Sequence, residues 1–343
     1  MSANVYVTRR IPQPGLDALR EAGVRFDVNP DDRVLTREEL LAGVRGRDAV
    51  LCLLTDTVDD AVFAAAGPGC RVFSNYAVGF NNIDVDAATR RGVMVTNTPG
   101  VLTETTADLA WALMLAASRR IVESDRFFRT GRWEGWGPMQ FLGHDVHGAT
   151  LGIVGAGRIG TATAKRAAGF GMNILYTSRS ANDTLDGMGG QHVSLEQLLR
   201  ESDFVSIHVA FNDETRHLIG AAQLGMMKSS AYLINTARGP IVDETALVAA
   251  LREKRIAGAG LDEHEGEPTP APGLADRASG SAAPGLEERA SGSGWSCACR
   301  VHTASRVGDG SDAREDGGDG GAEFDRCVAR ASACEPRQLR RAR

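Results

Sequence analysis

Three closely spaced glycines, Gly155, Gly157 and Gly160, are the feature that most constrains how this 343-residue chain folds. They follow directly on the apolar run 150–154, which predicts a strand, and they precede residues 161–170, which predict a helix. Gly155 permits a tight turn, Gly157 lets the backbone approach a ligand closely, and Gly160 lets the helix pack on the strand. The start of such a helix offers free N–H groups and a positive dipole end to a diphosphate. The predicted dinucleotide site therefore contains Gly155, Gly157, Arg158, Ile159 and Gly160.

The next predicted strand, residues 173–176, lacks the acidic residue at its end that would bind a ribose 2′-hydroxyl. Ser178, Arg179 and Ser180 follow it instead. A guanidinium flanked by two hydroxyls can hold a 2′-phosphate, and no carboxylate is there to repel that phosphate. The sequence thus favours NADP(H), with NAD(H) possible. Stacking of Arg179 on the adenine would leave the choice between the two cofactors open.

Alternating apolar and helical segments on both sides of the glycines predict two domains, each a parallel sheet covered by helices. We expect an α/β protein of two Rossmann-like, doubly wound domains. A flavodoxin-like, substrate-binding domain would span residues 1–100 and a dinucleotide-binding domain residues 101–276, linked by a long helix from Thr103 to Val122. Residues 277–343 contain few large apolar side chains and are rich in Gly, Ser, Ala, Arg and Asp, so we expect a disordered tail there.

Composition excludes several classes of partner. The net charge is −6 and the basic residues are scattered, which argues against nucleic acid. No run reaches the roughly 18 apolar residues of a membrane span, and no apolar leader opens the chain, so we expect a cytoplasmic protein. Of the six cysteines, Cys52 and Cys70 lie in apolar surroundings and predict buried thiols. The pair Cys297 and Cys299 lacks a second pair at zinc-like spacing, so we expect no metal.

Arg238 comes directly after the predicted strand 231–236, at the edge where open α/β sheets bind ligands. A guanidinium there can grip a carboxylate with two N–H groups and also contact the adjacent carbonyl oxygen of the same ligand. The following predicted strand ends at Asp262, and a loop containing Glu267 comes after it. The sequence therefore predicts a site for a small anionic carbonyl compound beside the dinucleotide.

Several motifs, in this order along the chain, resemble those of the D-2-hydroxyacid dehydrogenase family. They are Asn75-Tyr-Ala-Val-Gly79-Phe-Asn-Asn-Ile-Asp84, the glycine turn, Asn235-Thr-Ala-Arg238-Gly and Gly260-Leu-Asp-x-x-Glu-Gly-Glu267-Pro. Two further motifs resemble the glyoxylate/hydroxypyruvate reductase branch more specifically: Trp133-x-x-Trp136-x-Pro and Leu142-Gly-x-Asp-Val-His-Gly148. The resemblance covers roughly residues 3–276.

The resemblance implies NAD(P)H-dependent reduction of a small 2-oxo acid, such as glyoxylate or hydroxypyruvate, to the D-2-hydroxy acid. Arg238 would orient the substrate, and the backbone at Val78 and Gly79 would hold its carboxylate. Glu267 would pair with a histidine that protonates the carbonyl oxygen. Trp136 would reach into the substrate site of a partner subunit, which implies a homodimer. The cofactor cleft would include Thr106, Val209, Thr215, Thr236, Ala237 and Asp262.

The chain departs from the family where the histidine should be. No Pro-His-x-Gly-Ser segment follows Glu267, so the resemblance implies impaired activity and a first domain without its closing C-terminal helix. His264 stands where the family has an aromatic residue and Glu263 where it has an aliphatic one, so we expect a more exposed strand end. A reading frame shifted by one base from about Arg277 permits both Pro-His-Arg-Gly-Ser and an amphipathic helix. The sequence beyond that residue is therefore interpreted as out of frame.

Two other hypotheses stay open. The chain could be a catalytically inactive dinucleotide-binding protein of the same fold, which would bind the cofactor without turnover. It could also be a phosphoglycerate or formate dehydrogenase of the same family, although Trp133, Trp136 and the lack of a long added domain argue against this. The preferred acid is not indicated, because the predicted pocket consists largely of backbone and Arg238.

Overall fold

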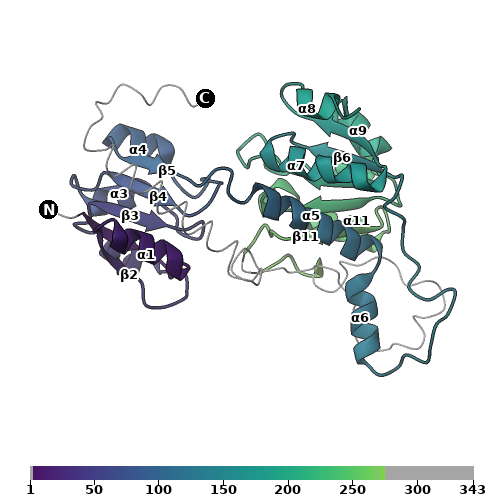
Figure 1. Cartoon of the computed structure of the whole chain (residues 1–343), viewed down its shortest axis with the longest axis horizontal. Helices are drawn as coiled ribbons and strands as arrows, with labels where there is room; N and C mark the ends of the chain where they lie inside the picture. Colours follow the sequence, from purple (N-terminus) through teal and green to yellow (C-terminus); the bar gives the residue numbers. More distant parts are fainter. Residues whose placement is uncertain (1–2, 268, 275–343) are drawn as a thin grey trace. The chain divides into compact units, whose positions relative to one another are not determined.

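A computed structural model describes residues 3–267 and 269–274 of the chain. The described residues form two compact units that divide between Leu102 and Thr103 (Figure 1). Each unit is built on a parallel sheet with helices around it, which confirms the predicted α/β class. The predicted tail, residues 277–343, lies outside the described residues.

The first unit contains a five-stranded sheet in the order β2-β1-β3-β4-β5. Its strands, all paired in parallel, are β1 (Asn4–Val7), β2 (Arg25–Val28), β3 (Ala49–Cys52), β4 (Val72–Asn75) and β5 (Met94–Thr96). The connecting helices are α1 (Gln13–Glu21), α2 (Arg37–Gly43), α3 (Asp60–Ala66) and α4 (Val85–Arg91). This strand order is the flavodoxin-like one that the sequence predicted.

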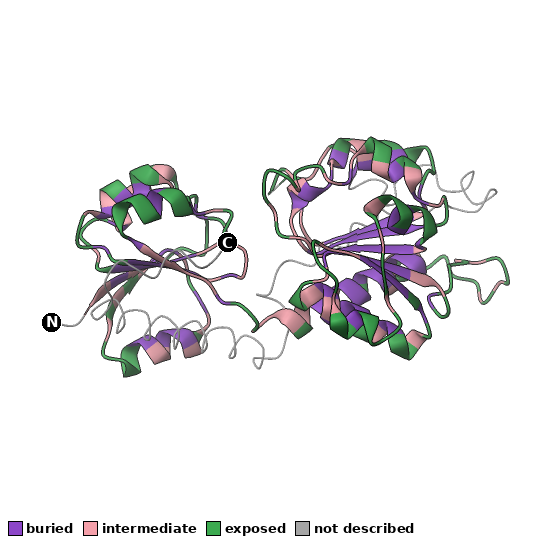
Figure 2. Cartoon of the chain, turned by 90° about the horizontal axis from the view of Figure 1, so that it is seen from above, coloured by how far each residue is buried: buried purple, intermediate pink, exposed green. Residues whose placement is uncertain are grey.

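The two faces of this sheet bury different sets of side chains. Helix α1 packs Leu16 and Leu19 on the face formed by Val5, Val7 and Leu51. Helices α2, α3 and α4 pack on the opposite face, where Phe63 and Phe73 meet edge to face. Figure 2 shows the buried strands between these layers. Cys52 and Cys70 are buried free thiols, as predicted.

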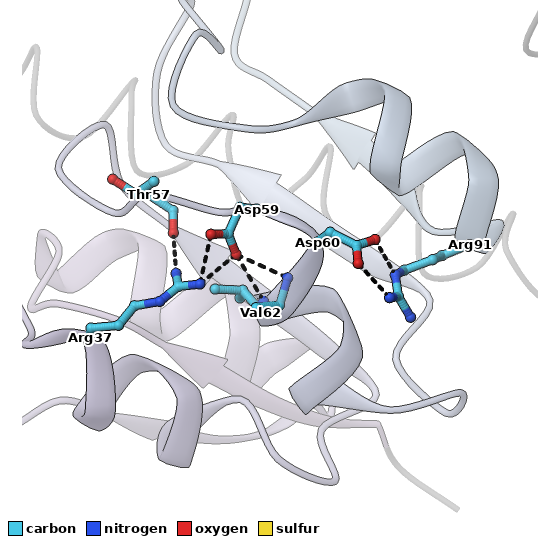
Figure 3. A network of polar contacts seen from close by, with 7 residues as sticks. Arg37, Thr57, Asp59, Asp60, Val62 and Arg91 are labelled. Atoms are coloured by element: carbon cyan, nitrogen blue, oxygen red, sulfur yellow. Dashed lines mark hydrogen bonds and ion pairs between the residues drawn. The ribbon is translucent and has the colours of Figure 1, made fainter.

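Short polar side chains fix where the helices of the first unit begin. Asp59 accepts hydrogen bonds from the N–H groups of Ala61 and Val62 and so caps α3. Figure 3 shows that Arg37 of α2 pairs with the same Asp59 carboxylate, while Arg91 of α4 pairs with Asp60. Exposed pairs of this kind contribute little stability individually, but these two connect the three helices on one face of the sheet.

The second unit contains a six-stranded parallel sheet in the order β11-β10-β9-β6-β7-β8. Its strands are β6 (Thr150–Val154), β7 (Asn173–Thr177), β8 (Gln191–His192), β9 (Phe204–Ile207), β10 (Tyr232–Asn235) and β11 (Gly258–Leu261). Counted from β6, this is the 3-2-1-4-5-6 order of dinucleotide-binding domains, whose ligand crevice lies where the order reverses. That point is between the carboxyl ends of β6 and β9.

Helices cover both faces of the second sheet. One core joins α5 (Thr103–Ser118) and α7 (Arg158–Ala167) to the sheet, with α8 (Asp183–Asp186) at its edge. The other hydrophobic core joins the sheet to helices α9 (Leu195–Glu201), α10 (Ala221–Met226) and α11 (Glu244–Arg252). Short 3-10 turns lie at Ala168–Phe170 and Gly239–Ile241.

The single helix predicted from Thr103 to Val122 is wrong at its end. Helix α5 stops at Ser118, and α6 (Ile121–Arg129) begins after Arg120. Arg120 has a left-handed backbone (φ 54°) that no α-helix can continue through. Its buried guanidinium pairs with Glu123 in the first turn of α6, Nε to Oε2 at 2.6 Å, which stabilises the break.

Candidate active site

The turn after β6 requires a glycine for two reasons. Gly155 has a φ of +101°, in the region that side chains disfavour. A Cβ on Gly155 would also lie 2.7 Å from the amide nitrogen of Val209 and 2.8 Å from the carbonyl carbon of His208. These two residues follow β9, so the glycine allows the backbones to meet at the point where the strand order reverses.

The other two glycines of the turn differ from one another. A Cβ on Gly160 would lie 2.1 Å from the Gly155 carbonyl oxygen, so this residue must lack a side chain for α7 to approach β6. A Cβ on Gly157 would meet no described atom within 4 Å. Gly157 is also the N-cap of α7 and supplies no side-chain acceptor to the first turn of the helix. Gly157 therefore faces open space at a helix start, which is the geometry of a diphosphate cradle.

Two exposed cations follow the glycine turn and β7 in the sequence. Arg158 and Arg179 are both exposed, and neither guanidinium contacts a partner among the described residues. Beside Arg179, the Ser178 hydroxyl donates to the Ser180 carbonyl oxygen at 2.5 Å. The end of β7 thus presents a free guanidinium and two hydroxyl-bearing residues, as the sequence suggested.

Sequence reasoning missed Asn182, which ties the glycine turn to the loop after β7. Its side-chain amide donates to the Ala156 carbonyl oxygen and the Thr161 hydroxyl, each at 2.9 Å. Its side-chain oxygen accepts from the N–H groups at the start of α8. The only signal in the sequence was an N-cap residue type, and nothing in it indicated which distant backbone the amide would reach.

The loop after β9 contains the predicted cofactor residues Val209 and Thr215. The Thr215 hydroxyl donates to the Ala210 carbonyl oxygen at 2.8 Å and so closes the loop. His208 precedes them with its Nε2 atom 2.9 Å from the Ser206 hydroxyl. Burial lowers the pKa of His208 to about 3, which favours a neutral imidazole near pH 7.

The carboxyl ends of β10 and β11 bring together the predicted Thr236, Ala237, Arg238 and Asp262. Arg238 donates from Nη1 to the Ala237 carbonyl oxygen at 2.6 Å and to the Glu263 carboxylate at 3.1 Å. The Thr236 hydroxyl and the Asp262 Oδ1 atom are buried and have no hydrogen-bond partner within the part of the chain described. Buried polar atoms usually find a partner, so these two orphans point to a ligand at this edge.

The expectation of a more exposed strand end at Glu263 is wrong. Its side chain is only 14% exposed because it folds back on Arg238. Burial, reinforced by Glu267 and Asp262 nearby, raises the pKa of Glu263 to about 7 although Arg238 opposes the shift. Burial likewise raises the pKa of Asp262 to about 6.

Among the described residues, no histidine side chain contacts Glu267. This carboxylate accepts only the backbone N–H of His264, at 3.1 Å. The His264 imidazole is buried and turns to Glu244 of α11 instead, with Nδ1 3.0 Å from Oε1. Glu244 also accepts the N–H groups of Glu265 and Ala271, so it anchors the loop. His264 is thus a structural residue, in keeping with its poor fit to the family's catalytic segment.

In the first unit, Asn75 and Asn97 hold the predicted substrate loop by its carbonyl groups. The Asn75 amide donates to the Gly79 oxygen at 2.7 Å, and the Asn97 amide donates to the Val78 oxygen at 2.8 Å. The N–H groups of Val78 and Gly79 have no acceptor in the described part of the chain. Asn97 lies in the turn after β5 and was missed because its partner is distant in the sequence.

The remaining predicted residues lie on α5 and beyond α6. Thr106 is half-buried in the first turns of α5. Trp136 is 85% exposed, and Trp133, Met139 and Leu142 in the same segment are also exposed.

Within residues 3–267 and 269–274, no helix is long and apolar enough to cross a bilayer. The same residues contain no group of three or more His, Cys, Asp or Glu side chains that could hold a metal ion.

Comparisons with known proteins define the class. Residues 111–279 match the family described as D-isomer specific 2-hydroxyacid dehydrogenase, NAD binding domain. A glyoxylate reductase from Korarchaeum cryptofilum is 53% identical over 272 residues, 79% of this chain and 81% of that protein. One from Thermococcus gammatolerans is 50% identical over 273 residues, 78% and 81% of the two chains. The crystal structure of a glyoxylate reductase from Paecilomyes thermophila has a TM-score of 0.71 at 35% identity, covering 80% of this chain and 85% of that one.

The chain belongs to the D-isomer specific 2-hydroxyacid dehydrogenase family. It is therefore an oxidoreductase that uses a nicotinamide dinucleotide and acts on 2-oxo and 2-hydroxy acids. The family match ends at residue 279, close to the point from which the sequence is interpreted as out of frame. The family's Pro-His-x-Gly-Ser segment is absent from the sequence after Glu267.

Proposed function

We propose that this chain reduces a small 2-oxo acid, glyoxylate or hydroxypyruvate, with NADPH as its preferred cofactor. The observation that carries the proposal is Arg238 at the carboxyl end of β10, in the same sheet edge as the glycine turn. Several relatives named glyoxylate reductase support the choice of substrate. In this proposal residues 3–102 bind the substrate and residues 103–274 bind the dinucleotide.

The turn from Gly155 to Gly160 binds the diphosphate through the N–H groups that open α7. Arg179, with Ser178 and Ser180, binds the 2′-phosphate of NADP(H), which the free guanidinium and the absence of a carboxylate at the end of β7 support. A bound reduced nicotinamide supplies the hydride for the reaction. The residues that line its cleft are Thr106, Val209, Thr215, Thr236, Ala237 and Asp262, two of which present the orphaned atoms described above.

Arg238 orients the substrate by holding its carboxylate and polarising its carbonyl oxygen. In the first unit, the N–H groups of Val78 and Gly79, which have no acceptor among the described residues, are proposed to bind a substrate carboxylate. Hydrogen-bond donors that are fixed in advance toward a developing oxyanion accelerate a reaction strongly, since removing one typically costs about 100–1000-fold in rate. In this scheme Arg238 is therefore a catalytic residue.

Glu267 is proposed to serve the proton transfer, but the Pro-His-x-Gly-Ser segment that would supply its histidine partner is absent from the sequence. Loss of a general acid typically costs about 10²–10⁴-fold in rate. That observation favours a second candidate function, a catalytically inactive dinucleotide-binding protein. The exposed Trp136 supports a homodimer in which this residue enters the partner's site, because Trp133, Met139 and Leu142 in the same segment are exposed as well, and gathered exposed apolar side chains mark interaction surfaces.

A nicotinamide absorbance assay with glyoxylate and hydroxypyruvate tests the proposal. We expect reduced cofactor to be consumed and Arg238→Ala to lower kcat/KM by at least about 100-fold. Arg255→Ala is the matched control, because Arg255 pairs only with the exposed Glu253 on the surface and should leave activity unchanged. Cofactor binding without turnover of any small 2-oxo acid would support the inactive alternative instead.

A further inference from the structure

Glu263 occupies part of the guanidinium of Arg238. Its Oε1 atom lies 3.1 Å from Nη1 of Arg238, and the side chains of the two residues are 14% and 21% exposed. A carboxylate in this position makes the same contact that the carboxylate of a 2-oxo acid must make.

The charges around Glu263 oppose its ionisation. The nearby acids Asp262 and Glu267 raise the pKa of Glu263, whereas Arg238 and His264 lower it. Burial is the largest effect, and the balance raises the pKa of Glu263 to about 7. The raised pKa brings the protonation of Glu263, and with it the ion pair with Arg238, toward the neutral pH range.

We infer that Glu263 competes with the anionic substrate for Arg238, so that substrate binding is coupled to uptake of a proton by Glu263. The inference rests on the proposed role of Arg238. A substrate carboxylate next to Glu263 would place two negative charges on one guanidinium in a partly buried site. Protonation of Glu263 removes that repulsion, weakens its contact with Nη1 of Arg238, and leaves a neutral carboxyl group that can donate a hydrogen bond.

The effect of pH on substrate affinity can be calculated from the pKa of Glu263. If only the protonated form of Glu263 admits the anion, the apparent Kd rises about tenfold for each pH unit above the pKa of about 7. Between about pH 6 and about pH 9 the loss of affinity then reaches up to about 100-fold. At about pH 8 each binding event takes up nearly one proton, because most Glu263 is ionised beforehand.

Calorimetry with oxamate, a monoanion that cannot be reduced, tests the inference on the full chain saturated with NADPH. We expect the Kd to rise with pH as calculated, and heats in buffers of different ionisation enthalpy to report the proton uptake. Glu263→Gln should bind oxamate about tenfold more tightly at about pH 8, with a flat pH profile. Glu265→Gln is the matched control, because its carboxylate pairs with His217 at 2.5 Å and not with Arg238.

Each outcome has a separate meaning. Oxamate binding that is independent of pH in the unmodified chain, or unchanged in Glu263→Gln, overturns the inference and leaves the proposed function standing. Absence of oxamate binding at every pH in both proteins, with NADPH bound, contradicts the role of Arg238 itself. The unmodified chain alone decides the pH dependence, so the test holds even where Glu263→Gln fails to fold.

Discussion

Gly160→Ala should lower the stability of the fold, whereas Gly157→Ala should weaken cofactor binding and leave the stability unchanged. A methyl group on Gly160 would lie 2.1 Å from the Gly155 carbonyl oxygen and 3.0 Å from Ile153 Cγ2, so α7 must move away from β6. Overpacking of this kind costs about 1–3 kcal/mol, and the better helix propensity of alanine returns about 1 kcal/mol. We therefore expect Gly160→Ala to lose up to about 2 kcal/mol of unfolding free energy.

Gly157→Ala should fold as stably as the original chain, because its methyl group meets no described atom within 4 Å. That methyl group instead occupies the space through which the diphosphate approaches, so we expect the Kd for NADPH to rise at least about tenfold, or about 1.4 kcal/mol. Urea denaturation measures the first effect and calorimetry with NADPH the second. Unchanged NADPH affinity in a well-folded Gly157→Ala protein would refute the assignment of this turn to the cofactor.

Three further results are expected. Arg179→Ala should weaken NADPH binding by about 10–100-fold, the value of a charge-assisted hydrogen bond, and leave NADH binding unchanged in calorimetry; equal loss for both would contradict a 2′-phosphate site. The folded chain holds protons on Glu263 and Asp262 that the unfolded chain releases at lower pH, since their pKa values are raised to about 7 and about 6. These two carboxyl groups contribute stability that is lost as pH rises from about 4 to about 7, whereas the lowered pKa of His208 contributes stability that rises over the same range. Glu263→Gln should therefore make the change in unfolding free energy from about pH 4 to about pH 7 more favourable by up to about 3 kcal/mol in urea titrations; an identical pH profile in the variant would refute this. Replacing the residues after Arg277 by the other-frame sequence should raise glyoxylate turnover by about 10²–10⁴-fold, and equal turnover would refute the argument from the missing histidine.

Most of the fold was predictable, because it depends on patterns that lie close together in the sequence. The apolar runs that form β6 and β9 predict buried strands. The glycines between β6 and α7 satisfy steric demands that few other residues can meet. The positions of Arg238 and Asp262 followed from the same logic, since the residue after a parallel strand faces the ligand edge of the sheet.

What could not be predicted depends on side chains that meet across the fold. The pairing of Glu263 with Arg238 joins residues 25 positions apart, and a strand-end glutamate by itself suggests exposure. His264 pairs with the distant Glu244 in the same way. The break at Arg120 was hidden because the apolar periodicity of a helix continues through it, whereas the left-handed backbone is stabilised by a buried ion pair with Glu123.

The handedness of the product tests the central claim most directly. Hydroxypyruvate becomes chiral on reduction, so long incubation with NADPH followed by chiral chromatography reports both the reaction and the face attacked. We predict D-glycerate, formed in proportion to the NADPH consumed and lost in Arg238→Ala. Formation of the L-isomer, or consumption of NADPH without glycerate, would contradict a D-specific 2-oxo acid reductase built on the glycine turn and Arg238.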